Sequence, residues 1–214
     1  MYRDDLTCPP PHEIGTVTTA LHEFAESLGT AVDARDHHTR QHSEEVAQVA
    51  YGLAVRMELP AAQADVIHVA AHLHDVGKIG IPDSVLFKPG PLTPDEWTLI
   101  KRHPCIGAEI VQPVRALCRC GIREMILHHH ERWDGQGYPY GLRGTEIPLG
   151  ARIIAVADSL SAMMQYRPYR SAMGFTQARD EILQNSGSQF DPNVVAAFDR
   201  SSAMIGQLME MLGE

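Results

Sequence analysis

The stretch His-Leu-His-Asp-Val-Gly-Lys, residues 72–78, places two histidines, an aspartate and a lysine at the end of an apolar run. That run predicts a helix over residues 61–76 that ends at Gly77, because glycine adopts the backbone conformation common just after a helix. His74 continues the apolar stripe of this helix, so its side chain is expected to point inward. The pattern fits a polar helix end, and it equally fits part of a metal site.

Helical signals continue on both sides of this stretch, with no sustained alternation of the kind that marks strands. A capping box at residues 93–96 predicts a helix start, and Pro60 predicts the end of a helix that begins near Thr39. The segment 132–150, rich in glycine, proline and aromatic residues, is expected to be a functional loop. Further helices are predicted over residues 19–28, 106–117, 119–131, 150–164, 175–185 and 192–199.

These signals predict an all-α protein with a single domain. A chain of 214 residues is long enough for one sizeable core and lies near the upper end of what one core fills. We divide the chain into a flexible, proline-rich tail (1–12), an N-terminal helix (13–30), a central domain (31–200) and a C-terminal helix (201–214).

Composition restricts the classes of partner. A formal net charge of −9 argues against a DNA or RNA polymer, whose phosphate backbone requires a basic surface. No apolar run approaches the roughly 20 residues that span a bilayer, and the first residues lack the apolar stretch of a signal peptide. The four cysteines form no CxxC pair, which favours free thiols in a reducing compartment. We therefore expect a cytoplasmic protein without a membrane partner, which can still bind a small phosphate-bearing ligand at a local concentration of cations.

Five of the predicted helices each aim a histidine or an aspartate at the core. His103 is expected to close the helix that Thr93 opens. Burying imidazoles and carboxylates costs free energy unless they are paired, so several together indicate a shared partner. One or two divalent metal ions are the simplest such partner, and mixed nitrogen and oxygen ligands suit zinc, iron, manganese or nickel better than calcium or magnesium. The candidate ligands are His42, His74, Asp75, His103, His129, His130 and Asp158.

Three further histidines fall outside this set by helical phase. His68 and His72 project from other faces of the helix over residues 61–76, and His128 points away from the adjacent pair of histidines. Supporting or surface roles are expected for these three.

The ordered string of these residues resembles the HD superfamily of metal-dependent phosphohydrolases, and in more detail its HD-GYP branch. The similarity extends over about residues 30–200, and its motifs are long and specific. They read His74-Asp75-Val76-Gly77-Lys78, Lys101-Arg-His103-Pro104, His129-His130-Glu131, Asp134-Gly135-Gln-Gly137-Tyr138-Pro139 and Arg167-Pro168-Tyr169-Arg170.

The resemblance implies an HD-domain helical bundle with a long GYP loop, and a bacterial phosphodiesterase that hydrolyses cyclic di-GMP to pGpG or GMP. It implies the same ligand set, with Asp75 bridging two ions, usually iron or manganese, that activate a hydroxide. Asp75 and Lys78 would be catalytic, with Lys78 near the scissile phosphate, where an ammonium group stabilises developing negative charge. Tyr138, Arg167 and Arg170 would contact the nucleotide, and arginines suit phosphate oxygens well.

Two positions depart from the family pattern. Some members carry a glutamate where this chain has His38 and hold a third metal. His38 lies one turn before His42 and is a candidate extra ligand, but a two-metal site is the preferred interpretation. The second departure is Ser161, where the family commonly has aspartate, and we expect the change to remove an acceptor near the cleft.

Two other hypotheses stay open beside the active phosphodiesterase. One is a catalytically weak module that binds cyclic di-GMP or a GGDEF-domain partner. GGDEF-domain proteins synthesise this messenger, and in the family the GYP loop is linked to contacts with them. The other is a hydrolase of a different cyclic dinucleotide. The N-terminal helix is also a candidate surface for a homodimer.

Overall fold

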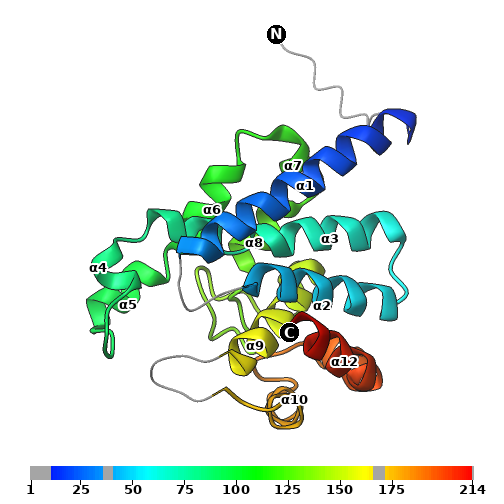
Figure 1. Cartoon of the computed structure of the whole chain (residues 1–214). Helices are drawn as coiled ribbons and strands as arrows, with labels where there is room; N and C mark the ends of the chain where they lie inside the picture. The colour runs from blue at the N-terminus through cyan, green and yellow to red at the C-terminus, as the bar shows by residue number, and fades with distance from the viewer. Residues whose placement is uncertain (1–10, 36–40, 166–171, 214) are drawn as a thin grey trace.

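The computed structural model describes residues 11–35, 41–165 and 172–213 of the chain. Every regular element within them is an α-helix or a short 3₁₀-helix, which confirms the predicted all-α class (Figure 1). The elements are α1 (Pro11–Arg35), α2 (His42–Arg56), α3 (Ala61–Leu73), η1 (Val76–Gly80), α4 (Asp83–Leu86), α5 (Pro94–Ile100), α6 (His103–Val111), α7 (Arg115–Arg119), α8 (Ile122–His128), η2 (Gly144–Glu146), α9 (Leu149–Met164), α10 (Phe175–Gln184), α11 (Pro192–Arg200) and α12 (Ser202–Leu212).

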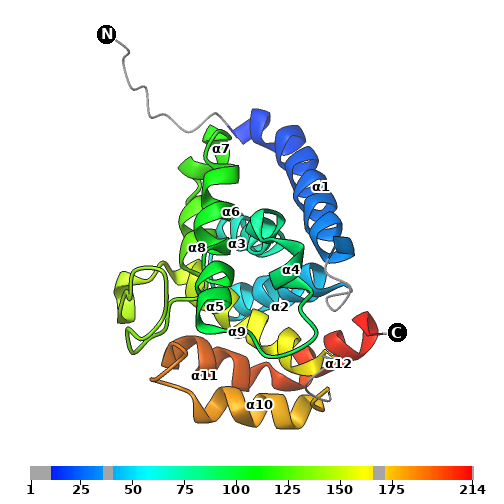
Figure 2. The same cartoon turned by 90° about the vertical axis from the view of Figure 1, so that its left-hand side faces the viewer.

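The centre of the fold is formed by α2, which packs against α3 and α9. Leu53, Ile67 and Ile154 come from these three helices and are fully buried. Burying one such side chain stabilises the fold by about 1.5–3 kcal/mol. Helices α10, α11 and α12 gather on one side of this centre, and α6 and α8 lie on another (Figure 2).

The last turn of α1 is tied to two elements at once. The carboxylate of Asp33 accepts hydrogen bonds from the backbone N–H of Ser43 (2.8 Å) and from its hydroxyl (2.9 Å), so it caps the start of α2. Arg35 donates to the carbonyls of Lys78 (2.7 Å) and Ile81 (2.9 Å) around η1. The end of α1 therefore fixes the start of α2 relative to η1.

The end of α3 differs from the prediction. The α-helix stops at Leu73 rather than at residue 76, and Gly77 lies inside η1 instead of terminating the helix. A Cβ atom on Gly77 would come 1.9 Å from the carbonyl oxygen of His103 and 2.5 Å from the backbone nitrogen of Gly107. The glycine is therefore required for the contact between η1 and α6. The sequence pattern did not predict this contact.

The helix boundaries between residues 93 and 131 also need correction. The capping box at Thr93 is present, but the helix it opens ends at Ile100, and His103 begins α6 instead of closing α5. The single helix expected over 106–117 is interrupted where Pro113 removes a backbone donor, and the one expected over 119–131 is shortened to α8. The turn before α8 is made by Gly121, whose φ of 80° suits glycine.

The N-terminal helix and the helices near the C-terminus were predicted more closely. Helix α1 is longer than the predicted 13–30 at both ends, and α10, α11 and α12 fall at the expected places. The segment between α8 and α9 consists of turns and the short η2, as expected for 132–150. In the described residues, no helix has the length and apolar character needed to cross a membrane.

Candidate metal centre

Six of the seven predicted metal ligands form two compact groups of donor atoms. The first group is His42, His74 and Asp75, and the second is His103, His129 and His130. Within each group one donor atom per residue lies within 4.8 Å of the others. The first group comes from the start of α2 and the end of α3, and the second from the start of α6 and the end of α8.

Asp75 lies between the two groups, with one oxygen toward each. Its Oδ2 is 3.3 Å from Nε2 of His74 and 3.8 Å from Nε2 of His42. Its Oδ1 is 3.2 Å from Nε2 of His103. This carboxylate is therefore placed to serve two adjacent cations, one on each oxygen.

The seventh predicted ligand, Asp158, projects from α9 toward the first group. Its Oδ1 lies 3.2 Å from Nε2 of His42 and 4.0 Å from Nε2 of His74. Together with His129 and His130, Asp158 also lines a small hollow.

Three of the imidazole rings are held by the same backbone contact. The Nδ1 atoms of His74, His103 and His129 each lie 2.7 or 2.8 Å from the carbonyl oxygen three residues earlier in the chain. Because a carbonyl only accepts, each Nδ1 carries a proton, which leaves Nε2 as the ring nitrogen that can bind a metal. Metal-binding histidines are commonly oriented in this way.

The bare nitrogens provide a test of whether a metal fits the site. The Nε2 atoms of His103 and His129 lie 3.2 Å apart, and both rings already donate from Nδ1. Two lone pairs at this distance repel each other unless a cation or a proton lies between them. Nε2 of His74 is likewise buried, with no hydrogen-bond partner in the described part of the chain. The donor set therefore fits a divalent metal ion.

The electrostatics of the two groups differ. Burial lowers the pKa of His103 and His129, and it lowers the pKa of His130 to about 3, so these three rings are neutral donors at neutral pH. Burial also acts to lower the pKa of His74, but the charges of Asp75 and Asp158 outweigh it and raise that pKa to about 9. The first group therefore holds more negative charge than the second.

Lys78 supplies the nearest fixed positive charge. Its Nζ lies 2.7 Å from Oδ2 of Asp75, and its side chain is largely buried. Burial alone would raise the pKa of Asp75, but Lys78, His74 and His103 hold it well below its usual range. The structure thus brings Lys78, predicted as catalytic, to the centre of the metal ligands.

The GYP loop closes over the second group. The Tyr138 ring lies 4.9 Å from the ring of His130, and burial raises the pKa of its hydroxyl. Glu131, for which the sequence predicted no role, accepts hydrogen bonds from the backbone N–H groups of Tyr140 (2.8 Å) and Leu142 (3.1 Å). This buried carboxylate fixes the loop beside the donors.

Three predicted residues lie outside the described part of the chain. They are His38, the candidate extra metal ligand, and Arg167 and Arg170, the expected phosphate contacts.

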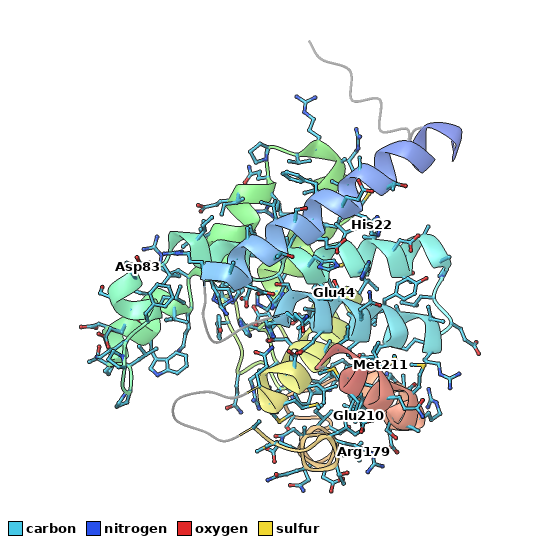
Figure 3. The ribbon with its side chains drawn as sticks, viewed as in Figure 1. His22, Glu44, Asp83, Arg179, Glu210 and Met211 are labelled. Atoms are coloured by element: carbon cyan, nitrogen blue, oxygen red, sulfur yellow. The ribbon has the colours of Figure 1, made fainter. Side chains whose placement is uncertain are left out.

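The structure places His68, His72 and His128 away from the two donor groups. Only His68 is partly exposed, whereas His72 and His128 are buried, so of the two expected roles a supporting one stays open for those two and a surface one does not. The rings of His68 and His72 meet edge to face between α1 and α2, with centroids 4.7 Å apart. Figure 3 labels two of their neighbours, His22 on α1 and Glu44 on α2.

This second histidine cluster predicts a loss of stability in mild acid. Burial and the neighbouring His72 and His22 lower the pKa of His68 to about 4, compared with 6.5 in an unfolded chain. The unfolded state therefore binds more protons as the pH falls from 6.5 to 4, so the stability present above pH 6.5 is lost over this range. His68→Gln should reduce the loss of unfolding free energy between pH 7 and pH 5 by about 1 kcal/mol, after a discount for solvent screening. Urea unfolding of chelator-treated protein at both pH values measures this, and equal losses in variant and wild type would contradict it.

Comparison with known proteins identifies a family and several relatives. The HD domain family matches residues 26–194. A cyclic di-GMP phosphodiesterase of Thermotoga maritima is 43% identical over 179 residues, covering 83% of this chain and 48% of the relative. The 3′3′-cGAMP-specific phosphodiesterase 2 of Vibrio cholerae is 39% identical over 195 residues, covering 91% of this chain and 37% of the relative.

A solved structure shares the fold. The crystal structure of a cyclic GMP-AMP specific phosphodiesterase of V. cholerae aligns with a TM-score of 0.65 at 22% identity, covering 89% of this chain and 49% of that chain. This chain therefore spans half or less of the length of the relatives it resembles.

Proposed function

The chain belongs to the HD domain family, and on that premise we propose that it is a metal-dependent phosphodiesterase of the HD-GYP branch, hydrolysing cyclic di-GMP to pGpG or GMP. The observation that carries this proposal is the position of Asp75, with one carboxylate oxygen toward the histidines of the first group and the other toward His103 of the second group. The 43% identical Thermotoga protein, named a cyclic di-GMP phosphodiesterase, supports the choice of substrate.

We assign the ligands to two divalent ions, with iron or manganese preferred for a mixed set of imidazole and carboxylate donors. His42, His74, Asp75 and Asp158 would hold one ion, and Asp75 with His103, His129 and His130 would hold the other. When bound, such a pair withdraws charge from phosphate oxygens and acidifies water. A third ion at His38 is not favoured.

The chain's own groups act around that pair. Lys78, held against Asp75 by a 2.7 Å contact, has an ammonium group that can donate a hydrogen bond to a phosphate oxygen or a proton to the departing 3′ oxygen. Arg35 fixes the turn that carries this lysine through its bond to the Lys78 carbonyl. Tyr138 contributes a wall beside His130 against which part of the nucleotide can pack. Arg167 and Arg170 are proposed to bind the phosphates.

A second candidate substrate is a mixed cyclic dinucleotide. The 39% identical relative of V. cholerae is named a 3′3′-cGAMP-specific phosphodiesterase, so relatives with similar overall identity act on different bases. A weak binding module is less well supported, because the complete set of donors from His42 to Asp158 is gathered in one place.

The test is anaerobic purification with metal analysis, followed by incubation with cyclic di-GMP and with 3′3′-cGAMP and separation of the products. We expect about two metal ions per chain, faster hydrolysis of cyclic di-GMP than of 3′3′-cGAMP, and no turnover after treatment with a chelator. Binding of cyclic di-GMP without turnover by the iron- or manganese-loaded protein would favour the binding module. Faster hydrolysis of 3′3′-cGAMP than of cyclic di-GMP would identify the mixed cyclic dinucleotide as the substrate instead.

The same proposal includes location and partners. We propose that the protein acts in the cytoplasm and that its GYP loop contacts GGDEF-domain proteins. The exposed Tyr140, with 67% of its surface accessible, is a suitable contact residue on that loop. A homodimer through α1 is a further proposal, which light scattering of the purified protein tests.

A further inference from the structure

His42 is held differently from His74, His103 and His129. Its Nδ1 lies 2.8 Å from the hydroxyl oxygen of Ser161, a fully buried residue of α9 far away in the sequence. His74, His103 and His129 use a nearby backbone carbonyl instead. The orientation of His42 therefore depends on a side chain from another helix.

The Ser161 hydroxyl has a second partner that decides the direction of this contact. It donates its hydrogen to Oε2 of Glu45, which lies on α2 close to His42 and is buried. The same carboxylate oxygen accepts a hydrogen bond from Nε2 of Gln165 at 3.2 Å. Because a hydroxyl has a single proton, Ser161 can only accept from His42.

We propose that Ser161 and Glu45 are positioning residues that fix His42 in the tautomer with its proton on Nδ1. Nε2 of His42 is then the ring nitrogen left for a cation, and it faces Oδ1 of Asp158 at 3.2 Å and Oδ2 of Asp75 at 3.8 Å. Without the carboxylate of Glu45, the serine could donate to Nδ1 and hold the other tautomer, whose Nε2–H cannot bind a cation. The assignment of that cation rests on the proposed function, whereas the tautomer does not.

This inference corrects one expectation from the sequence. Ser161 was expected to remove an acceptor near the cleft, but its oxygen is an acceptor for His42. The negative charge that an aspartate would bring to position 161 is supplied here by Glu45, on the far side of the hydroxyl. The serine and the glutamate thus act as a unit, and neither performs the role alone.

The experiment compares Ser161→Ala with Ser161→Thr, which keeps the hydroxyl. Ser201→Ala is the matched control, because Ser201 is also buried but its hydroxyl bonds only the carbonyl of Ala197 among the contacts described. The first readout is the tautomer of His42 in the metal-free protein, from its ¹⁵N resonances, assigned with a His42→Asn variant. The second is stepwise Mn²⁺ binding, followed by electron paramagnetic resonance.

Ser161→Ala should lose the Nδ1–H tautomer and bind one of two Mn²⁺ ions about 10- to 100-fold more weakly, while the other ion keeps its affinity. Ser161→Thr and Ser201→Ala should behave like the wild type. Glu45→Gln keeps the shape of the side chain but removes its charge. It should change both readouts in the same direction as Ser161→Ala, but to a smaller extent. If Ser161→Ala does not fold, Glu45→Gln is the variant that tests the proposal.

The proposal is overturned if neither Ser161→Ala nor Glu45→Gln changes the tautomer, or if both ions weaken equally. Failure of the proposed function gives a different result. A wild-type protein that binds no Mn²⁺ would contradict the metal centre, while the tautomer of His42 would still decide the role of Ser161.

Discussion

Asp75→Asn is expected to abolish paired metal loading and to reduce hydrolysis of cyclic di-GMP by about 1,000-fold or more, equivalent to about 4 kcal/mol of transition-state stabilisation. The carboxylate is the shared element of the site, because its two oxygens lie 3.3 Å from His74 and 3.2 Å from His103. An asparagine offers one neutral oxygen and an amide that repels a cation, so it cannot serve both sides. Metal analysis of the purified variant and product separation measure the two effects.

A change in the metal-free protein separates this effect from unfolding. Asp75 is the main group that raises the pKa of His74 to about 9, so Asp75→Asn should lower that pKa, which an NMR titration of the histidines reports. Asp95→Asn is the matched control, because Asp95 is an exposed aspartate in the first turn of α5. Full activity and metal content in Asp75→Asn, with a folded circular dichroism spectrum, would show that the site assignment is wrong.

The candidate ligands could be predicted because helical phase determines the direction of a side chain. His42 and Asp158 each continue an apolar stripe, and the structure places Nε2 of His42 3.2 Å from Oδ1 of Asp158. A buried carboxylate without a partner is costly, so its presence on an inward stripe indicates a cation even before any fold is known. Periodicity and the cost of burial therefore pointed to most of the candidate ligands that the structure brings close together, and the resemblance to a family pointed to the same residues.

The parts that could not be predicted depend on contacts between distant segments. The bond from His42 to Ser161 joins residues 119 positions apart, and no local pattern encodes it. His103 is a different case, because Pro104 in the first turn of α6 is a local signal that a helix starts there. Pro113 did carry a local signal, but it was passed over in the expected helix 106–117.

Gly77→Ala is expected to destabilise the fold by about 3 kcal/mol or more and to remove activity with it. A Cβ atom there would lie 1.9 Å from the carbonyl oxygen of His103, and the obstacle is backbone, which cannot rotate away. Relief requires η1 and α6 to separate, which moves Asp75 away from His103 and divides the two donor groups. Urea unfolding and Mn²⁺ titration of the variant measure both consequences.

Gly52→Ala is the matched control for this substitution. Gly52 lies within α2, and a Cβ there would meet only the flexible end of Met204, at an ordinary 3.5 Å. Because alanine has a higher helix propensity than glycine, this change should stabilise the protein by up to about 1 kcal/mol. If Gly77→Ala lowers the free energy of unfolding and Gly52→Ala raises it, then close backbone contact, rather than loss of glycine flexibility, determines the requirement for glycine at position 77. Equal unfolding midpoints for Gly77→Ala and the wild type would instead mean that η1 and α6 do not meet as closely as 1.9 Å implies.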